Sequence, residues 1–162
     1  MESNYMFAHL ANNSVTIQTL ASSVSCTGAT CGTGKADGNG DIFVNDNVTW
    51  ASPAKLTLRA HRHIAINKTI TANGATGSLA LEYGQGSTNG AGSNYFIAAD
   101  AKVNLQAGQN FSTKQGSAGT TRNFTVINAL GAQGSTSTTD LQGIAGNVSG
   151  NYALGADIDA SA

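Results

Sequence analysis

Apolar residues two positions apart recur along this chain, separated by stretches rich in Gly, Asn, Ser and Thr. Residues two apart on a strand face the same side, so each couplet places two side chains inward while its neighbours face solvent. The couplets are Val15/Ile17, Ile42/Val44, Leu56/Leu58, Ile64/Ile66, Leu79/Leu81, Val103/Leu105 and Phe124/Val126. The pattern predicts short strands and an all-β fold.

The couplets return at intervals close to the repeat length of solenoid proteins. Their starts suggest two interleaved ladders, Val15 to Ile42 to Ile64 and Leu56 to Leu79 to Val103 to Phe124. In the second ladder the starts lie 23, 24 and 21 residues apart. Repetition at this interval is typical of solenoids. The sequence therefore predicts a parallel β-helix, or β-solenoid, of about five to seven coils whose core is built from these couplets.

The polar stretches between the couplets suggest how the chain is organised. We expect β-helix coils over residues 1–128, with a loop of small residues at 21–41 and a lengthened, projecting turn at 85–94. Residues 129–162 lose the even couplets, so we expect an irregular segment there that returns to a coil of the same solenoid near its end. One continuous domain is the prediction.

The composition indicates a folded chain with few charges. Of its 162 residues 40% are hydrophobic, which is compatible with one domain and a buried core. Only 10% are charged, against roughly 25% in typical globular proteins, and the formal net charge is −1. No basic cluster is larger than the one at residues 59–63, so we expect no nucleic-acid partner.

Membrane insertion is not expected from this sequence. No stretch approaches the roughly 18 apolar residues of a membrane helix. The N-terminal MESNYMFAHLANN also lacks the basic and continuous apolar regions of a signal peptide. Its first three residues favour a piece excised from a longer chain.

Cys26 and Cys31 enclose only four residues in a stretch rich in Ser, Thr and Gly. A local disulfide is the interpretation we favour, with free thiols and a metal or redox role as the alternatives. Zinc sites need about four ligands, and His9, His61 and His63 do not have finger spacing. A disulfide would place the chain in an oxidising compartment.

Asparagine follows several couplets directly. Asn45 follows Val44, Asn67 follows Ile66, and Asn128 comes shortly after Val126. Asn tolerates turn conformations, and its amide can bond to the same amide one coil above. We predict that Asn45, Asn67 and Asn128 are corner residues of successive coils; a row of ligand-binding amides is the alternative.

Two clusters have residue types that metals prefer, yet we expect no metal and no other cofactor. Arg59, His61 and His63 alternate, so all three would face one side, but a third ligand is missing and Arg59 would repel a cation. The oxygen-rich stretch KADGNGDIFVND resembles a calcium loop only once and imperfectly. Solvated side chains and a polar turn explain both.

Catalysis is also not expected. The acidic residues are mostly isolated in turns, and Glu82 has no obvious partner one coil away. Tyr83 and Tyr95 flank the 85–94 loop and could stack on a sugar ring, although packing in the core is the simpler interpretation. We therefore expect that the chain is not an enzyme.

Several stretches resemble a known family. GDIFVNDNVTWAS, KLTLRAHRHIAINKTITA, GSLALEYG and NFTVINALG resemble the repeat region of filamentous-haemagglutinin-type exoproteins, the large secreted passengers of bacterial two-partner secretion. LQGIAGNVSGNYALGADIDAS resembles a segment common in those proteins, so the resemblance covers residues 15–162. It implies a right-handed parallel β-helix. The chain departs from the family pattern at His61 to His63, where small turn residues are expected.

The resemblance further implies a role in adhesion, aggregation or biofilm attachment. We expect a structural and adhesive segment of a large secreted protein at the bacterial cell surface, which presents its loops on a β-helical rod. Its partners would be a host or bacterial surface receptor or glycan and, for the parent chain, an outer-membrane partner transporter. The first alternative is an extracellular filament subunit whose coils stack end to end. The second is a carbohydrate-active β-helix.

Overall fold

The computed structural model describes residues 9–21 and 39–161, and these form short strands with almost no helix. The strands are β1 (Val15–Gln18), β2 (Ile42–Val44), β3 (Val48–Trp50), β4 (Lys55–Arg59), β5 (Ile64–Ile66), β6 (Ile70–Ala72), β7 (Ser78–Tyr83), β8 (Tyr95–Ile97), β9 (Val103–Asn104), β10 (Gly108–Gln115), β11 (Arg122–Ile127) and β12 (Tyr152–Leu154). One short 3₁₀ helix, η1 (Gln142–Gly146), lies among them. The prediction of an all-β fold is confirmed.

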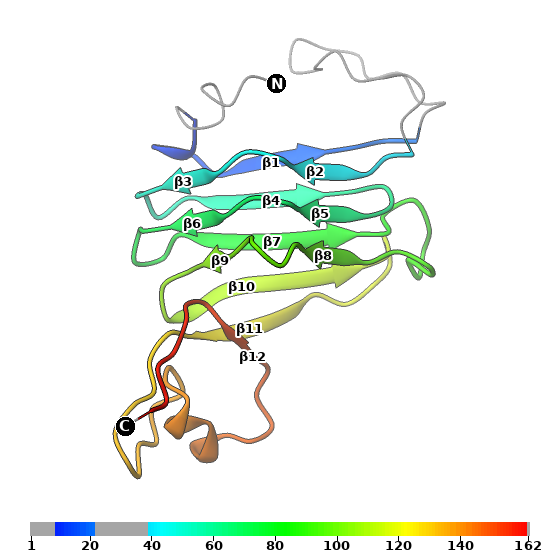
Figure 1. The fold of residues 1–162 in the computed structure, drawn as a ribbon. Coiled ribbons are helices and arrows are strands. Elements are labelled where there is room, and N and C mark those ends of the chain that lie inside the picture. The colour runs from blue at the N-terminus through cyan, green and yellow to red at the C-terminus, as the bar shows by residue number, and fades with distance from the viewer. Residues whose placement is uncertain (1–8, 22–38, 162) are drawn as a thin grey trace.

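The strands lie in three sheets, and the chain visits these sheets in a fixed order (Figure 1). Sheet A has the order β1-β4-β7-β10-β11-β12, sheet B is β2-β5-β8, and sheet C is β3-β6-β9. Each set of three consecutive strands from β1 to β9, here called a triplet, thus adds one strand to each sheet. Every pair between neighbouring triplets is parallel.

The inward-facing couplets of neighbouring triplets lie directly opposite one another. Leu56 pairs with Leu79 and Leu58 with Leu81 in sheet A, and all four side chains are at most 1% exposed. Alternation along each strand turns the intervening side chains to the opposite face of the sheet, where the small Thr57 and Ala80 are themselves covered. The three sheets therefore share one aliphatic core.

The order of the couplets differs from the two predicted ladders. Val15 pairs with Leu56 in sheet A rather than stacking on Ile42, and Val103 pairs with Ile70 in sheet C. The sequence prediction also missed sheet C itself, whose inward residues include Val48 and Trp50. One repeat therefore uses three strands instead of two, and the described residues form three complete triplets where about five to seven coils were expected.

The sequence predicted parallel coils up to residue 128, but the parallel arrangement ends at β10. β11 runs antiparallel to β10, with Phe124 opposite Phe111, and β12 then pairs parallel with β11. The turn at 116–121 reverses the chain, so Phe124 comes beside β10 from the opposite direction. Between β11 and β12 the chain is irregular and contains η1, where the Gly143 N–H donates to Asp140 Oδ1 at 2.6 Å.

Truncation of one inward leucine should destabilise the whole stack of triplets. Leu81 is fully buried between Leu58 and Thr113, so Leu81→Ala should lower the free energy of unfolding by about 2–5 kcal/mol. Thr49→Ala is the matched control on an exposed position of β3, expected to cost about 0.5 kcal/mol or less. Urea denaturation followed by circular dichroism measures both. Equal midpoints for the two variants would contradict the inward placement of Leu81.

Candidate functional site

A pocket lies where the aliphatic core ends, between β7, β8, β10 and β11. Its volume is about 450 Å³. Its walls are three aromatic rings and four polar side chains, contributed by Tyr83, Tyr95, Thr113, Gln115, Thr120, Arg122 and Phe124. Four of these seven side chains are polar, so the lining favours a hydrophilic ligand over an apolar one.

The strand register explains why the core becomes polar at this point. Thr113 of β10 lies opposite Leu81, and Gln115 lies opposite Tyr83. In sheet B, Tyr95 lies opposite the fully buried Ile64. At these inward positions Leu81 is thus followed by Thr113 and Tyr83 by Gln115 in sheet A, while Ile64 is followed by Tyr95 in sheet B. A pocket forms because these side chains do not fill the interior as aliphatic chains do.

Two tilted aromatic pairs form the apolar part of the site. The Tyr83 and Tyr95 ring centroids are 5.5 Å apart at an interplanar angle of 57°, and those of Phe111 and Phe124 are 5.3 Å apart at 41°. Burial, with a smaller contribution from the neighbouring Tyr83, raises the pKa of the Tyr95 phenol above its ordinary value. Tyr95 therefore stays protonated at neutral pH and can donate a hydrogen bond.

The 85–94 segment, which joins Tyr83 and Tyr95 along the chain, lies against the turn after β10. Ser117 N–H donates to Ser87 O and Ala118 N–H to Thr88 O, while Gln115 Nε2 donates to Gly90 O at 3.1 Å. Gly90 and Gly116 both have positive φ, and a Cβ on Gly90 would lie 2.6 Å from Gly116 N. Only glycine permits this close approach. The segment was predicted to project, but it is held against the neighbouring turn.

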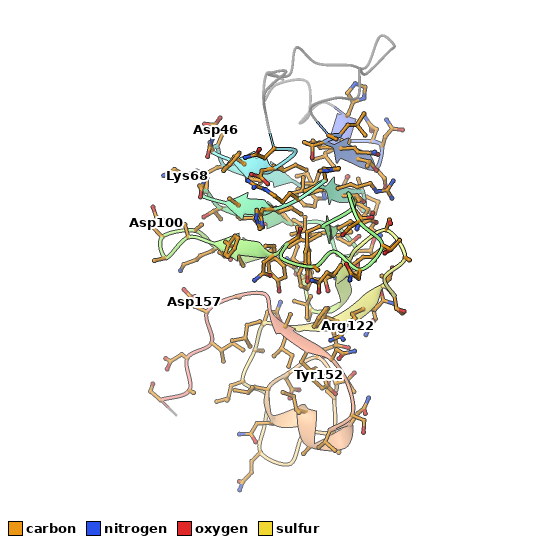
Figure 2. All side chains as sticks on the ribbon, turned by 90° about the vertical axis from the view of Figure 1, so that its right-hand side faces the viewer. Asp46, Lys68, Asp100, Arg122, Tyr152 and Asp157 are labelled. Carbon is orange, nitrogen blue, oxygen red and sulfur yellow. The ribbon has the colours of Figure 1, made fainter. Side chains whose placement is uncertain are left out.

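Arg122 is the one cationic side chain of the pocket wall. Figure 2 labels it on β11. The ion pairs within the described part of the chain use Arg59, Arg62, Lys68 and Lys102. Arg122 therefore has no acidic partner among the described residues. Its exposed guanidinium is available to an anionic ligand.

The predicted Arg59, His61 and His63 cluster does not converge on one face. Arg59 ends β4 and donates from Nε to Glu82 Oε2 at 2.6 Å, whereas His61 and His63 belong to the turn before β5. His63 Nδ1 accepts from Asn94 N–H at 3.1 Å, and its ring packs on Phe96. These contacts divide the cluster among three separate environments.

The same contacts correct the expectation for Glu82. The sequence showed no obvious partner one coil away, but Arg59 lies directly opposite Glu82 in the register. The pair is on the outer face of sheet A, separate from the pocket. Asp41 of the calcium-like stretch is likewise paired, because it binds Arg62; Asp37 lies outside the described residues.

Two of the three predicted corner asparagines stack. Asn67 Nδ2 donates to Asn45 Oδ1 at 2.8 Å, at the corner between sheets B and C. Ala98 occupies the corresponding corner of the next triplet, where its N–H donates to Ile66 O, so the amide stack ends after two members. Asn128 does not join it, because it follows β11 in sheet A.

Charged residues follow the same corner. Asp46, Lys68 and Asp100 form a column along one edge in Figure 2. Lys68 Nζ lies 3.9 Å from Asp100 Oδ2, and Lys102 pairs with Asp157. All four paired side chains are more than half exposed, so these ion pairs contribute little to stability.

The predicted disulfide, Cys26 with Cys31, lies outside the described residues and stays a prediction. Four couplet residues are half-buried, namely Val15, Ile17, Val103 and Phe124. The other couplet residues are buried: Ile42, Val44, Leu56, Leu58, Ile64, Ile66, Leu79, Leu81, Leu105 and Val126.

Tyr83 and Tyr95 were predicted from the sequence as ring-stacking candidates, and Phe124 was assigned to a parallel coil. The four polar residues of the pocket were missed because they belong to no apolar couplet: Thr113, Gln115, Thr120 and Arg122. The available signal was the Gly-rich turn at 116–119, which permits a hairpin between two strand-like segments and so brings β11 beside β10.

No protein-family model, curated protein or solved structure matches this chain. Within residues 9–21 and 39–161, no helix is long and apolar enough to cross a membrane. The resemblance to filamentous-haemagglutinin-type exoproteins thus remains an expectation from the sequence.

The Asp41 corner should make stability depend on pH. Arg62 donates to both Asp41 oxygens, at 2.9 and 2.6 Å, and His63 N–H donates to Oδ1 at 2.9 Å. The Arg62 hydrogen bond, more than any other contact, lowers the Asp41 pKa. This stabilisation is present above the unfolded pKa of about 4 and is lost as the pH falls through the lower folded pKa.

Asp41→Asn should therefore lower the melting temperature at pH 7 and change it little near pH 2. Asp46→Asn is the matched control, because Asp46 is exposed and forms none of the ion pairs among the described residues. Thermal unfolding of both variants between pH 2 and pH 7 measures the effect. A constant difference between wild type and Asp41→Asn across this range would show that the carboxylate does not stabilise the corner.

Proposed function

We propose that this chain is a structural and adhesive segment of a large secreted bacterial surface protein, of the filamentous-haemagglutinin type. The observation that carries the proposal is the repeated order of strands through three parallel sheets with one shared core. Such an arrangement extends by adding further triplets without changing its cross-section. It is suited to holding a binding site away from a surface.

In this proposal the three sheets are the walls of a right-handed parallel β-helix. This interpretation is supported by the path of the chain. After β1 the chain passes once through sheets B and C before it returns as β4 beside β1, and it does the same between β4 and β7. The hand follows from the family resemblance and from the strong preference for right-handed crossovers between parallel strands of one sheet. The parent protein would be exported through an outer-membrane partner transporter and act at the cell surface.

The pocket supports binding over catalysis. The described residues that line it include no carboxylate, and glycoside hydrolysis ordinarily requires two. Glu82 binds Arg59 on the outer face of sheet A. The lining therefore favours recognition of a ligand over hydrolysis by a carboxylate pair.

A second candidate function is end-to-end assembly into an extracellular filament. Among the described residues, β1, β2 and β3 each have a strand partner on one side only. Such edges present backbone groups that can pair with another chain. Electron microscopy of the purified chain at increasing concentration would favour this function if regular polymers formed.

Adhesion by the isolated chain tests the main proposal. Microspheres coated with the folded chain should remain on epithelial or bacterial cell layers in several-fold greater number than microspheres coated with albumin. Microspheres coated with heat-unfolded chain are the matched control and should behave as albumin does. Equal retention of all three, on every cell type used, would contradict an adhesive role.

A further inference from the structure

We infer that the pocket between β7, β8, β10 and β11 binds an acidic sugar, through ring stacking on its tyrosines and pairing of the ligand carboxylate with Arg122. The inference deepens the proposed adhesive function and rests on it for its biological meaning. The binding itself follows from the side chains that line the cavity.

The tyrosine pair provides a platform for a sugar ring. An aromatic face is electron-rich, and the C–H groups on one face of a pyranose are its natural complement. The Tyr83 and Tyr95 rings pack against each other at a tilt of 57°, and both line the cavity. Both residues are half-buried, and a ligand there would cover aromatic surface that now faces the cavity.

Polar side chains line the cavity beside the tyrosine pair, some of them buried and some exposed to solvent. Thr113 lies deep, at 7% exposure, whereas Gln115 and Thr120 are near the exposed rim. Hydroxyl and amide groups both donate and accept hydrogen bonds, which suits a ligand with many hydroxyl groups. Gln115 Nε2 already donates to Gly90 O, but a purely apolar ligand would cover the Thr113 and Thr120 hydroxyl groups without offering them a hydrogen bond, and that is costly.

Arg122 selects for a carboxylate among sugars. A guanidinium binds a carboxylate through two parallel hydrogen bonds, and Arg122 has no acidic partner within the described residues. None of the described residues that line the cavity carries a carboxylate that would oppose an anionic ligand. The volume of about 450 Å³ is at the small end of ligand sites and fits one or two sugar units.

Titration with monosaccharides tests the inference. D-glucuronate, D-galacturonate and N-acetylneuraminate are the acidic probes, and D-glucose and D-galactose are the neutral ones. Ligand-observed nuclear magnetic resonance gives each dissociation constant. We expect at least one acidic sugar to bind about tenfold more tightly than its neutral counterpart, the difference that one added charge-assisted contact provides.

Three variants distinguish binding in the pocket from nonspecific attraction of an anion to the positive charges of the protein. Arg122→Gln should weaken the acidic sugar about tenfold and change neutral sugars little, while Tyr95→Ala should weaken both. Lys114→Gln is the matched control, because it removes a positive charge from the same strand on the outer face, opposite Glu82, and should change neither. Circular dichroism confirms that each variant folds.

Three results would overturn the inference. The first is no binding of any acidic sugar by folded wild type, and the second is binding that neither Arg122→Gln nor Tyr95→Ala changes. The third is an acidic peptide that binds through Arg122 where sugars fail. Sugar binding without microsphere retention would instead contradict the adhesive function alone, and retention without sugar binding would contradict only this pocket.

Discussion

The parallel register between successive strands of sheet A is the contact on which the rest of this structure depends. It sets Leu56 on Leu79 and Leu58 on Leu81, and the same register continues into β10, where Leu81 meets Thr113. A slip of one residue would turn all these side chains to the opposite face. Because sheets B and C share this core, their positions follow from it, as do the corners that join them.

The candidate site is a consequence of the same register. The positions that continue the inward row of sheet A must face inward whatever residue they hold: Tyr83 follows Leu81 along β7, Thr113 lies opposite Leu81, and Gln115 lies opposite Tyr83. Inward polar side chains need hydrogen-bond partners or access to solvent. The reversal at β11 leaves such access beside β10 and brings Arg122 to the opening. The element that ends the regular repeat is thus the element that completes the pocket.

The sequence was sufficient for the couplets and for part of their order, and the reasons for its failures are physical. Ile42 over Ile64 and Leu56 over Leu79 were predicted because both pairs are aliphatic and similarly spaced. Sheet C was missed because Trp50 and Ala72, which differ greatly in size, share one column. The direction of β11 was missed because alternating apolar residues look the same in a parallel and an antiparallel strand, and only the turn at 116–121 reverses the chain. The Arg59 and Glu82 pairing needed the exact register, which spacing alone did not fix.

Native-state hydrogen exchange, followed by mass spectrometry at low urea concentrations, tests the shared core most directly. If the three sheets are one cooperative unit, the amides of β4, β5, β6 and β7 should open with one common free energy, equal to that of global unfolding. Peptides that contain η1 and β12 should exchange earlier, because they lie outside the triplets. Early exchange of β5 and β6 while β4 and β7 stay protected would contradict a core shared by the three sheets.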